Sequence, residues 1–192
     1  MRLIREAQYK RMPWKNGGGE TAEVAIWPEG AALDAFDWRI SMARVATDGP
    51  FSAFAGVDRT LAILEGGGLR LSIDGSEPAT LVAGAPPHTF PADRPTAASL
   101  IDGPVRDLNV MTARERFTHR VGFERLAAPL TWRPVGTSAW LICAAGGARV
   151  ACGSESVELG RYDSVDLGVV DRAVTVAPLG AAAVFLVELR GR

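Results

Sequence analysis

The stretch RTLAILEGGGLRLSI, residues 59–73, shows the rhythm from which the fold can be predicted. Two short runs rich in aliphatic and β-branched residues flank a run of three glycines, as expected for two strands joined by a tight turn. Similar runs occur at 21–27, 38–45 and 107–111, and between them stand breakers of Gly, Pro and Asp such as 48–50, 84–87 and 102–104. Strands and turns at this spacing predict an all-β sandwich or barrel.

A second series of short apolar runs follows an irregular bridge that contains residues 114–116 and two prolines, Pro129 and Pro134. The runs lie at 140–143, 149–152, 156–159, 164–167, 173–176 and 183–189. Because both halves alternate strand, Gly-rich turn and strand, the sequence predicts a duplicated barrel, although no repeat is clear residue by residue. We expect residues 1–130 to form the first barrel and residues 131–192 a second, smaller one.

Composition excludes several classes of function. The chain has 192 residues, 21 basic and 22 acidic, and a formal net charge of -1, and no block of Lys and Arg indicates a nucleic-acid or membrane surface. No apolar run approaches the roughly 20 residues that span a bilayer, and the first residues lack the apolar core of a secretion signal. We therefore expect a soluble cytoplasmic protein that binds neither nucleic acid nor membrane.

Alternation along the strands of the first half sorts polar from apolar side chains. Arg39 and Ser41 share one face of their strand, and Ile40 lies on the other. Asp107 and Asn109 separate in the same way from their apolar neighbours. On an open sheet these polar faces would meet water, whereas in a small closed barrel they would converge in the lumen, where such barrels often hold ligands.

Residues 14–21, WKNGGGET, form a second informative stretch. Glycine reaches positive φ and lets the backbone approach a neighbour closely, so the run is either a wall of a binding site or a flexible surface loop. Together with 36–43 (FDWRISMA), 48–52 (DGPFS), 56–61 (GVDRTL), Gly103-Pro104 and 107–111 (DLNVM), this stretch closely resembles the HutD family of bacterial proteins, also called Ves. The motif-by-motif match covers approximately residues 4–112.

The resemblance implies a bicupin, that is, two tandem cupin-type β-barrels. It also implies association with histidine utilisation and a barrel pocket for a small acidic intermediate such as N-formylglutamate, with a governing rather than a catalytic role. Some members of the family are described as environmental-stress proteins. Within the matching motifs, the residues expected to bind the ligand are Asn16, Thr21, Arg39, Ser41, Arg59, Asp107 and Asn109.

The chemistry of these residues fits an organic acid. A guanidinium group on Arg39 or Arg59 can grip a carboxylate through two charge-assisted hydrogen bonds. Hydroxyl and amide groups offer neutral partners, and glycine N–H groups in a bent loop can cradle an anionic oxygen. Asp107 can accept a hydrogen bond from a ligand or hold an arginine in position.

Other functional signals are weak. The chain has only two histidines, His88 and His119, and no diagnostic ligand spacing, so we expect no metal and no cofactor. No Walker loop, dinucleotide fingerprint or serine elbow is present. We therefore expect a small-molecule binder with a structural second barrel that would also allow a homodimer. The alternatives are a metal-independent isomerase, lyase or hydrolase using Asp107, Glu65 or Asp93, and an interaction scaffold.

Overall fold

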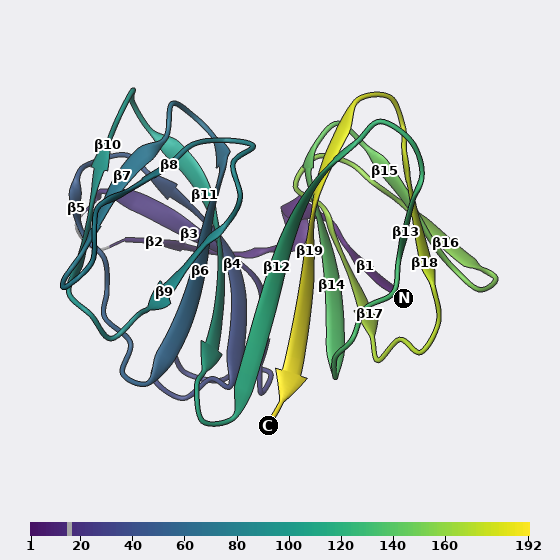
Figure 1. Ribbon diagram of the computed structural model, residues 1–192, viewed down its shortest axis with the longest axis horizontal. Helices are drawn as coiled ribbons and strands as arrows, with labels where there is room; N and C mark the ends of the chain where they lie inside the picture. The colour runs from purple at the N-terminus through teal and green to yellow at the C-terminus, as the bar shows by residue number, and fades with distance from the viewer. Residues whose placement is uncertain (15–16) are drawn as a thin grey trace. The chain divides into compact units, whose positions relative to one another are not determined.

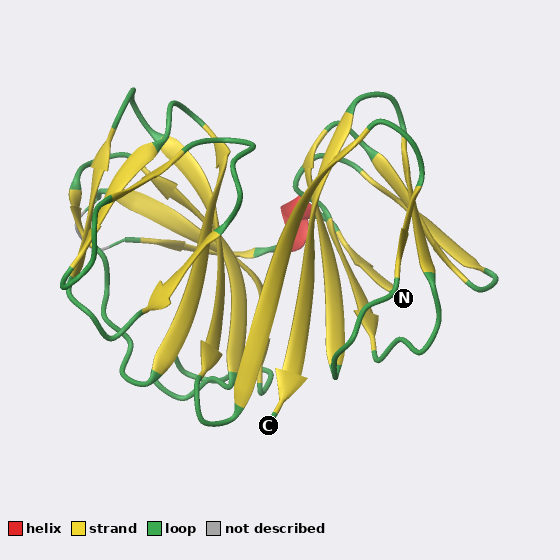
Figure 2. Ribbon diagram, in the orientation of Figure 1, coloured by secondary structure: helices red, strands yellow, loops and turns green. Residues whose placement is uncertain are grey.

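The computed structural model describes residues 1–14 and 17–192 and divides the chain into two compact units (Figure 1). We call Lys10–Thr118 the N-terminal barrel, and Met1–Tyr9 with His119–Arg192 the C-terminal barrel. Strands make up nearly all of the regular structure, with one short 3-10 helix at Glu6–Gln8 (Figure 2). No helix in the described part of the chain is long and apolar enough to cross a membrane.

The N-terminal barrel consists of two antiparallel sheets. In spatial order, the first sheet contains β2 (Lys10–Pro13), β3 (Gly19–Trp27), β4 (Trp38–Val45), β11 (Val105–Ala113), β6 (Val57–Glu65) and β9 (His88–Pro91). The second contains β5 (Gly49–Pro50), β10 (Thr96–Leu100), β7 (Leu69–Ile73) and β8 (Ala79–Leu81). The glycine turn between β6 and β7 therefore carries the chain from one sheet to the other.

The inner face of the first sheet is identified by its apolar contacts. Leu61 and Ile63 of β6 form one buried cluster with Leu69 and Leu71 of β7, so these side chains fill the space between the two sheets. Alternation then places every second residue of the neighbouring strands on the same inner face. A polar side chain on that face is enclosed by the barrel rather than turned to water.

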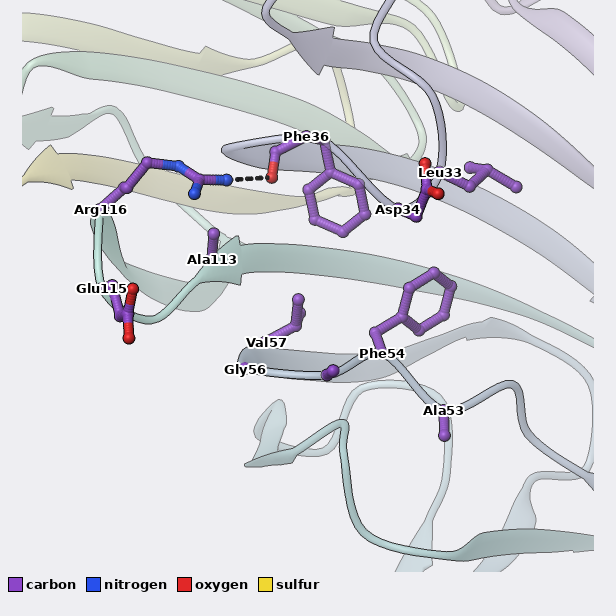
Figure 3. Close-up of a pocket in the computed structure, with 11 residues that line it drawn as sticks. Leu33, Asp34, Phe36, Ala53, Phe54, Gly56, Val57, Ala113, Glu115 and Arg116 are labelled. Carbon is purple, nitrogen blue, oxygen red and sulfur yellow. Dashed lines mark hydrogen bonds between the residues drawn. The ribbon is translucent and has the colours of Figure 1, made fainter.

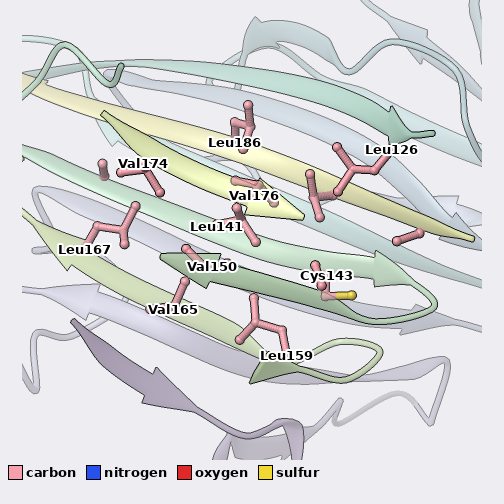
Figure 4. Close-up of a cluster of buried hydrophobic side chains, with 14 residues drawn as sticks. Leu126, Leu141, Cys143, Val150, Leu159, Val165, Leu167, Val174, Val176 and Leu186 are labelled. Atoms are coloured by element: carbon pink, nitrogen blue, oxygen red, sulfur yellow. The ribbon is translucent and has the colours of Figure 1, made fainter. Parts of the chain in front are cut away.

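The C-terminal barrel also pairs two sheets. One contains β1 (Arg2–Ile4), β17 (Ser164–Gly168), β14 (Ser138–Ala145), β19 (Ala182–Gly191) and β12 (Phe117–Leu126), and the other contains β13 (Leu130–Trp132), β18 (Val174–Pro178), β15 (Ala148–Cys152) and β16 (Glu155–Leu159). Its interior is aliphatic: Leu141, Val150, Val165 and Val176 belong to one fully buried cluster (Figure 4). This hydrocarbon filling suits a structural role.

The strands expected from the sequence coincide with strands of the structure, and the all-β prediction is confirmed. The expectation of an irregular bridge was wrong in part, because residues 117–126 form the long strand β12. Its side chains alternate between faces, but polar residues and Gly122 obscure the apolar pattern.

The two compact units do not divide at residue 130, the boundary expected from the sequence. Residues 1–9 join the C-terminal barrel because β1 pairs with β17, with Leu3 opposite Val165. The Tyr9 hydroxyl also donates to the carbonyl oxygen of Tyr162 at 2.7 Å and lies 2.9 Å from the hydroxyl of Ser164. The C-terminal unit resumes at His119, within β12.

Candidate functional site

Strand register brings the predicted polar residues into three adjacent rows on the inner face of the N-terminal barrel. The rows, read across β3, β4, β11 and β6, are Thr21–Ala43–Asp107–Ile63, Glu23–Ser41–Asn109–Leu61 and Ile26–Arg39–Met111–Arg59. Directly opposite residues on antiparallel strands share a face, and their Cβ atoms lie about 5 Å apart. Two arginines and two carboxylates are therefore gathered in one small region of the lumen.

Arg39 is 6% exposed, and its charge is balanced by Glu23. The Nε of Arg39 donates to Oε2 of Glu23 at 2.8 Å. Within the described residues the two terminal nitrogens of Arg39 have no hydrogen-bond partner, and they are not fully enclosed. The guanidinium group is thus fixed by the bond from its Nε to Glu23, and its two terminal nitrogens remain able to donate to a ligand.

Arg59 is 9% exposed and lacks a directly bonded carboxylate among the described residues. Its Nε donates to Oδ1 of Asn109 at 2.8 Å, its Nη2 donates to the same oxygen, and its guanidinium carbon lies 4.4 Å from the centre of the Phe51 ring. Burial lowers the pKa of Arg59 to about 10, against the opposing influence of Asp107, so the side chain remains a cation at neutral pH. Its Nη1 forms no hydrogen bond in the part of the chain that is described.

Asp107 is hydrogen-bonded to Asn109, which in turn binds Arg59. Its Oδ1 accepts from the backbone N–H of Ala43 at 3.1 Å and from Nδ2 of Asn109 at 2.6 Å, which fixes the Asn109 amide with its oxygen toward Arg59. Its Oδ2 is fully enclosed and is the single buried side-chain oxygen or nitrogen without a partner among the described residues. Burial raises the pKa of Asp107 to about 6, while Arg59 and the two hydrogen bonds act in the opposite direction.

The remaining predicted residues differ in their availability. Ser41 is 2% exposed, lies between Glu23 and Asn109 in its row, and makes no side-chain hydrogen bond within the described residues. Thr21 already accepts a hydrogen bond from Nε1 of Trp14 at 2.9 Å. Asn16 lies outside the described residues.

The glycine run serves a close backbone approach. A Cβ atom added to Gly19 would lie 2.1 Å from the carbonyl oxygen of Arg44 and 3.0 Å from the ring of Trp14. Gly19 therefore lets β3 begin directly against β4. This requirement comes from the sheet itself and needs no ligand.

Two residues outside the predicted ligand-binding set complete the site. Glu23 shares the inner face with Thr21 and could have been found from alternation along its strand. Phe51 follows the loop strand β5, and its ring lies beneath Arg59, a contact that no periodic pattern reveals.

A separate cavity of about 670 Å³ opens among the loops of the same barrel (Figure 3). Its lining includes two aromatic and three charged residues, namely Phe36, Phe54, Asp34, Glu115 and Arg116. None of the predicted ligand-binding residues that the structure describes lines it. This cavity could not be predicted from the sequence, because it forms where loops from distant parts of the chain meet. We call it the loop cavity.

Glu65 and Asp93, the other acid–base candidates, are not placed in the lumen network. Asp93 pairs with Arg114 at 3.1 Å, and this hydrogen bond lowers its pKa. Glu65 is exposed at the end of β6. Among the described residues no three His, Cys, Asp or Glu side chains are grouped so that they could hold a metal ion.

Two β-barrels in one chain, with a polar lumen in the first and an aliphatic interior in the second, define a protein of the bicupin class. A cupin 2 conserved barrel domain protein from Leptotrichia buccalis shares this fold, with a TM-score of 0.62, 10% identity, and 97% of this chain and 98% of that chain covered.

The chain belongs to the HutD family, whose model matches residues 6–184. It is similar to HutD from Pseudomonas fluorescens SBW25, with a TM-score of 0.83 and 31% identity, covering 100% of this chain and 98% of that one. An uncharacterized 21.2 kDa protein in the hutC 3′ region of Pseudomonas putida is 34% identical over 87% of this chain and 86% of its own length. Protein Ves of Citrobacter koseri is 40% identical over 58% of this chain and 59% of its own.

Proposed function

We propose that the N-terminal barrel binds a small carboxylated metabolite in its lumen and that the protein acts as a sensor in histidine utilisation. The proposal rests on the surroundings of Arg59, a buried cation without a bonded carboxylate among the described residues. A buried cation normally has a bonded anion, because removing a charge from water is costly. Arg59 instead rests on a neutral amide and an aromatic ring, with one nitrogen unused among the described residues.

The second arginine also has donors to offer a ligand. Arg39 presents two terminal nitrogens, and Met111 lies between the two arginines in their row. Since neighbouring strands are about 4.8 Å apart, the two guanidinium groups are spaced to hold an acid from two sides. An arriving carboxylate would supply Arg59 with its missing anionic partner and give Arg39 a second one.

The ligand class follows from the rest of the lumen. Ser41 offers a hydroxyl group that can donate to or accept from an amide or formyl group. Together with two arginines, this favours an acid that carries an acyl-amide. N-formylglutamate, the intermediate that the family resemblance suggests, is the compound of this class to test. Membership of the HutD family and the relative in the hutC 3′ region support the link to histidine utilisation.

Isothermal titration with N-formylglutamate tests the proposal. Replacing Arg39 alone would leave Glu23 buried without its partner, so we choose the matched double variant Arg39→Met with Glu23→Gln, and likewise Arg59→Met with Asp107→Asn. A hydrogen bond to a charged group contributes about 1.5–3 kcal/mol, so each double variant should weaken binding roughly 10- to 100-fold.

The control is Arg149→Met, an exposed arginine of the C-terminal barrel, which should bind as the unmodified protein does. Unchanged affinity in both double variants would contradict the proposal. Circular dichroism would show whether each variant keeps its β structure, so that loss of the fold is not mistaken for loss of the site.

A metal-independent enzyme is the second candidate, and one observation favours it. The raised pKa of Asp107, about 6, suits a general acid or base near neutral pH. Its unpartnered oxygen is enclosed, however, so a substrate proton would reach it only after neighbouring groups move. NMR of bound N-formylglutamate over hours separates the candidates: an unchanged compound supports the sensor, and a new product supports the enzyme.

A further inference from the structure

We propose that the loop cavity is a second ligand site, which binds a small organic cation with a flat apolar body. This proposal is independent of the carboxylate site, because the two sets of residues do not overlap. It rests on the shape of the cavity, its aromatic walls and the charges that remain available on its rim.

The aromatic walls come from two loops. Phe36 precedes β4 and Phe54 precedes β6, and their ring centres are 6.0 Å apart with planes tilted by 56°. Figure 3 shows Asp34 at the same end of the view as the Phe54 ring and Glu115 at the opposite end. The volume of about 670 Å³ lies within the range of metabolite sites.

The walls are supported from inside the barrel. Phe36 is 3% exposed and packs in a buried cluster with Val57, Ala92 and Met111, against which Phe54 also lies. A rigid aromatic side chain contributes contact area at a low cost in conformational entropy, and an organized cavity loses less on binding. The site is therefore largely formed before a ligand arrives.

The available charge on the rim is negative. Arg116 is already used, because it pairs with Asp37 and donates to the carbonyl oxygen of Phe36 at 3.1 Å. Asp34 and Glu115 form no ion pair or hydrogen bond within the described residues. An anion would meet two carboxylates, whereas a cation would be attracted to both.

The aromatic rings favour the same sign of charge. The face of a phenyl ring carries partial negative charge and attracts a cation within about 6 Å. An ammonium or imidazolium group can thus meet a carboxylate on the rim while its apolar body lies against Phe54, which the buried Phe36 ring supports from behind. Neither feature alone would select this ligand, but the two agree.

Benzylammonium is the probe, and it is titrated into ¹⁵N-labelled protein of full length. We expect saturable shifts in the amide signals of Phe54, Gly56 and Glu115, and at least about fivefold weaker binding of benzyl alcohol and benzoate, which have the same ring with a neutral or negative group. The double variant Asp34→Asn with Glu115→Gln should weaken benzylammonium binding about 10-fold.

Two further variants complete the test. Phe54→Ala should weaken binding by a similar factor, and Asp74→Asn with Glu77→Gln, which removes the same charge from exposed positions outside the cavity, should not change it. Shifts located elsewhere, equal binding of benzyl alcohol, or no saturation would overturn the proposal. N-formylglutamate titrations of the Asp34 and Glu115 variant report on the lumen separately, so either site can fail without the other.

Discussion

Replacing Asp107 by asparagine should alter how the stability of the protein depends on pH. Burial raises the pKa of Asp107 from its ordinary 3.8 to about 6 in the folded protein. The folded state therefore holds this proton more tightly than the unfolded state. The resulting stabilisation is complete only well below pH 4 and is lost as the pH rises to about 6. Above that value the free energy of unfolding no longer depends on Asp107 ionisation.

The magnitude follows from the two pKa values. The rise from 3.8 to about 6 corresponds to about 3 kcal/mol, at about 1.36 kcal/mol per pKa unit. The amide introduced by Asp107→Asn would keep an oxygen for the N–H of Ala43 and for Asn109 but would not titrate. The free energy of unfolding of the wild type, minus that of Asp107→Asn, should thus fall by about 2–2.5 kcal/mol between pH 4 and pH 7, because the unfolded state is already partly ionised at pH 4.

Urea unfolding at pH 4, 5, 6 and 7, followed by circular dichroism, measures this difference. All other titrating groups are common to both proteins, so subtraction isolates Asp107. The exposed Asp74→Asn is the matched control and should give a difference that varies by less than about 0.5 kcal/mol. A difference that stays constant or rises with pH for Asp107→Asn would mean that Arg59 and the hydrogen bonds offset burial, so that the pKa of Asp107 is not raised in the folded protein.

Three further substitutions test the fold around and away from the site. Gly19→Ala should destabilise the protein by about 1–3 kcal/mol in urea unfolding, because its Cβ would collide with the carbonyl oxygen of Arg44; an unchanged midpoint would show that β3 can shift. Leu141→Ala, in the aliphatic interior of the C-terminal barrel, should lower the free energy of unfolding by about 2–5 kcal/mol and leave the affinity for N-formylglutamate unchanged. A change in affinity of the folded protein would count against a structural role for that barrel. Tyr9→Phe should cost about 1–3 kcal/mol and increase amide hydrogen exchange in β1 and β17; exchange as slow as in the wild type would contradict its role in tying residues 1–9 to that barrel.

The strands, and the separation of polar from apolar side chains on their two faces, could be predicted from the sequence because both depend on local alternation. Arg39 and Ser41 alternate with apolar residues, as do Asp107 and Asn109, and the structure buries all four. What alternation leaves open is whether a polar face meets water or a lumen. That choice depends on the second sheet, which supplies leucines such as Leu69 to close the space.

Other features depend on pairings that no local pattern contains. The bond between Arg39 and Glu23 requires the register of β3 against β4, which is shifted by a bulge between Glu23 and Ala25. The loop cavity requires residues 33–36, 53–57 and 113–116 to meet, and their separation in sequence conceals this. The strand β12 was missed because charged residues and a glycine interrupt its apolar positions.

A crystal structure of the protein with N-formylglutamate would show whether the two buried arginines bind the acid. We expect a ligand carboxylate within hydrogen-bond distance, about 3 Å, of terminal nitrogens of both Arg39 and Arg59, inside the N-terminal barrel. Density for the ligand in the loop cavity or the C-terminal barrel, or an empty lumen in crystals soaked at saturating concentration, would contradict this expectation.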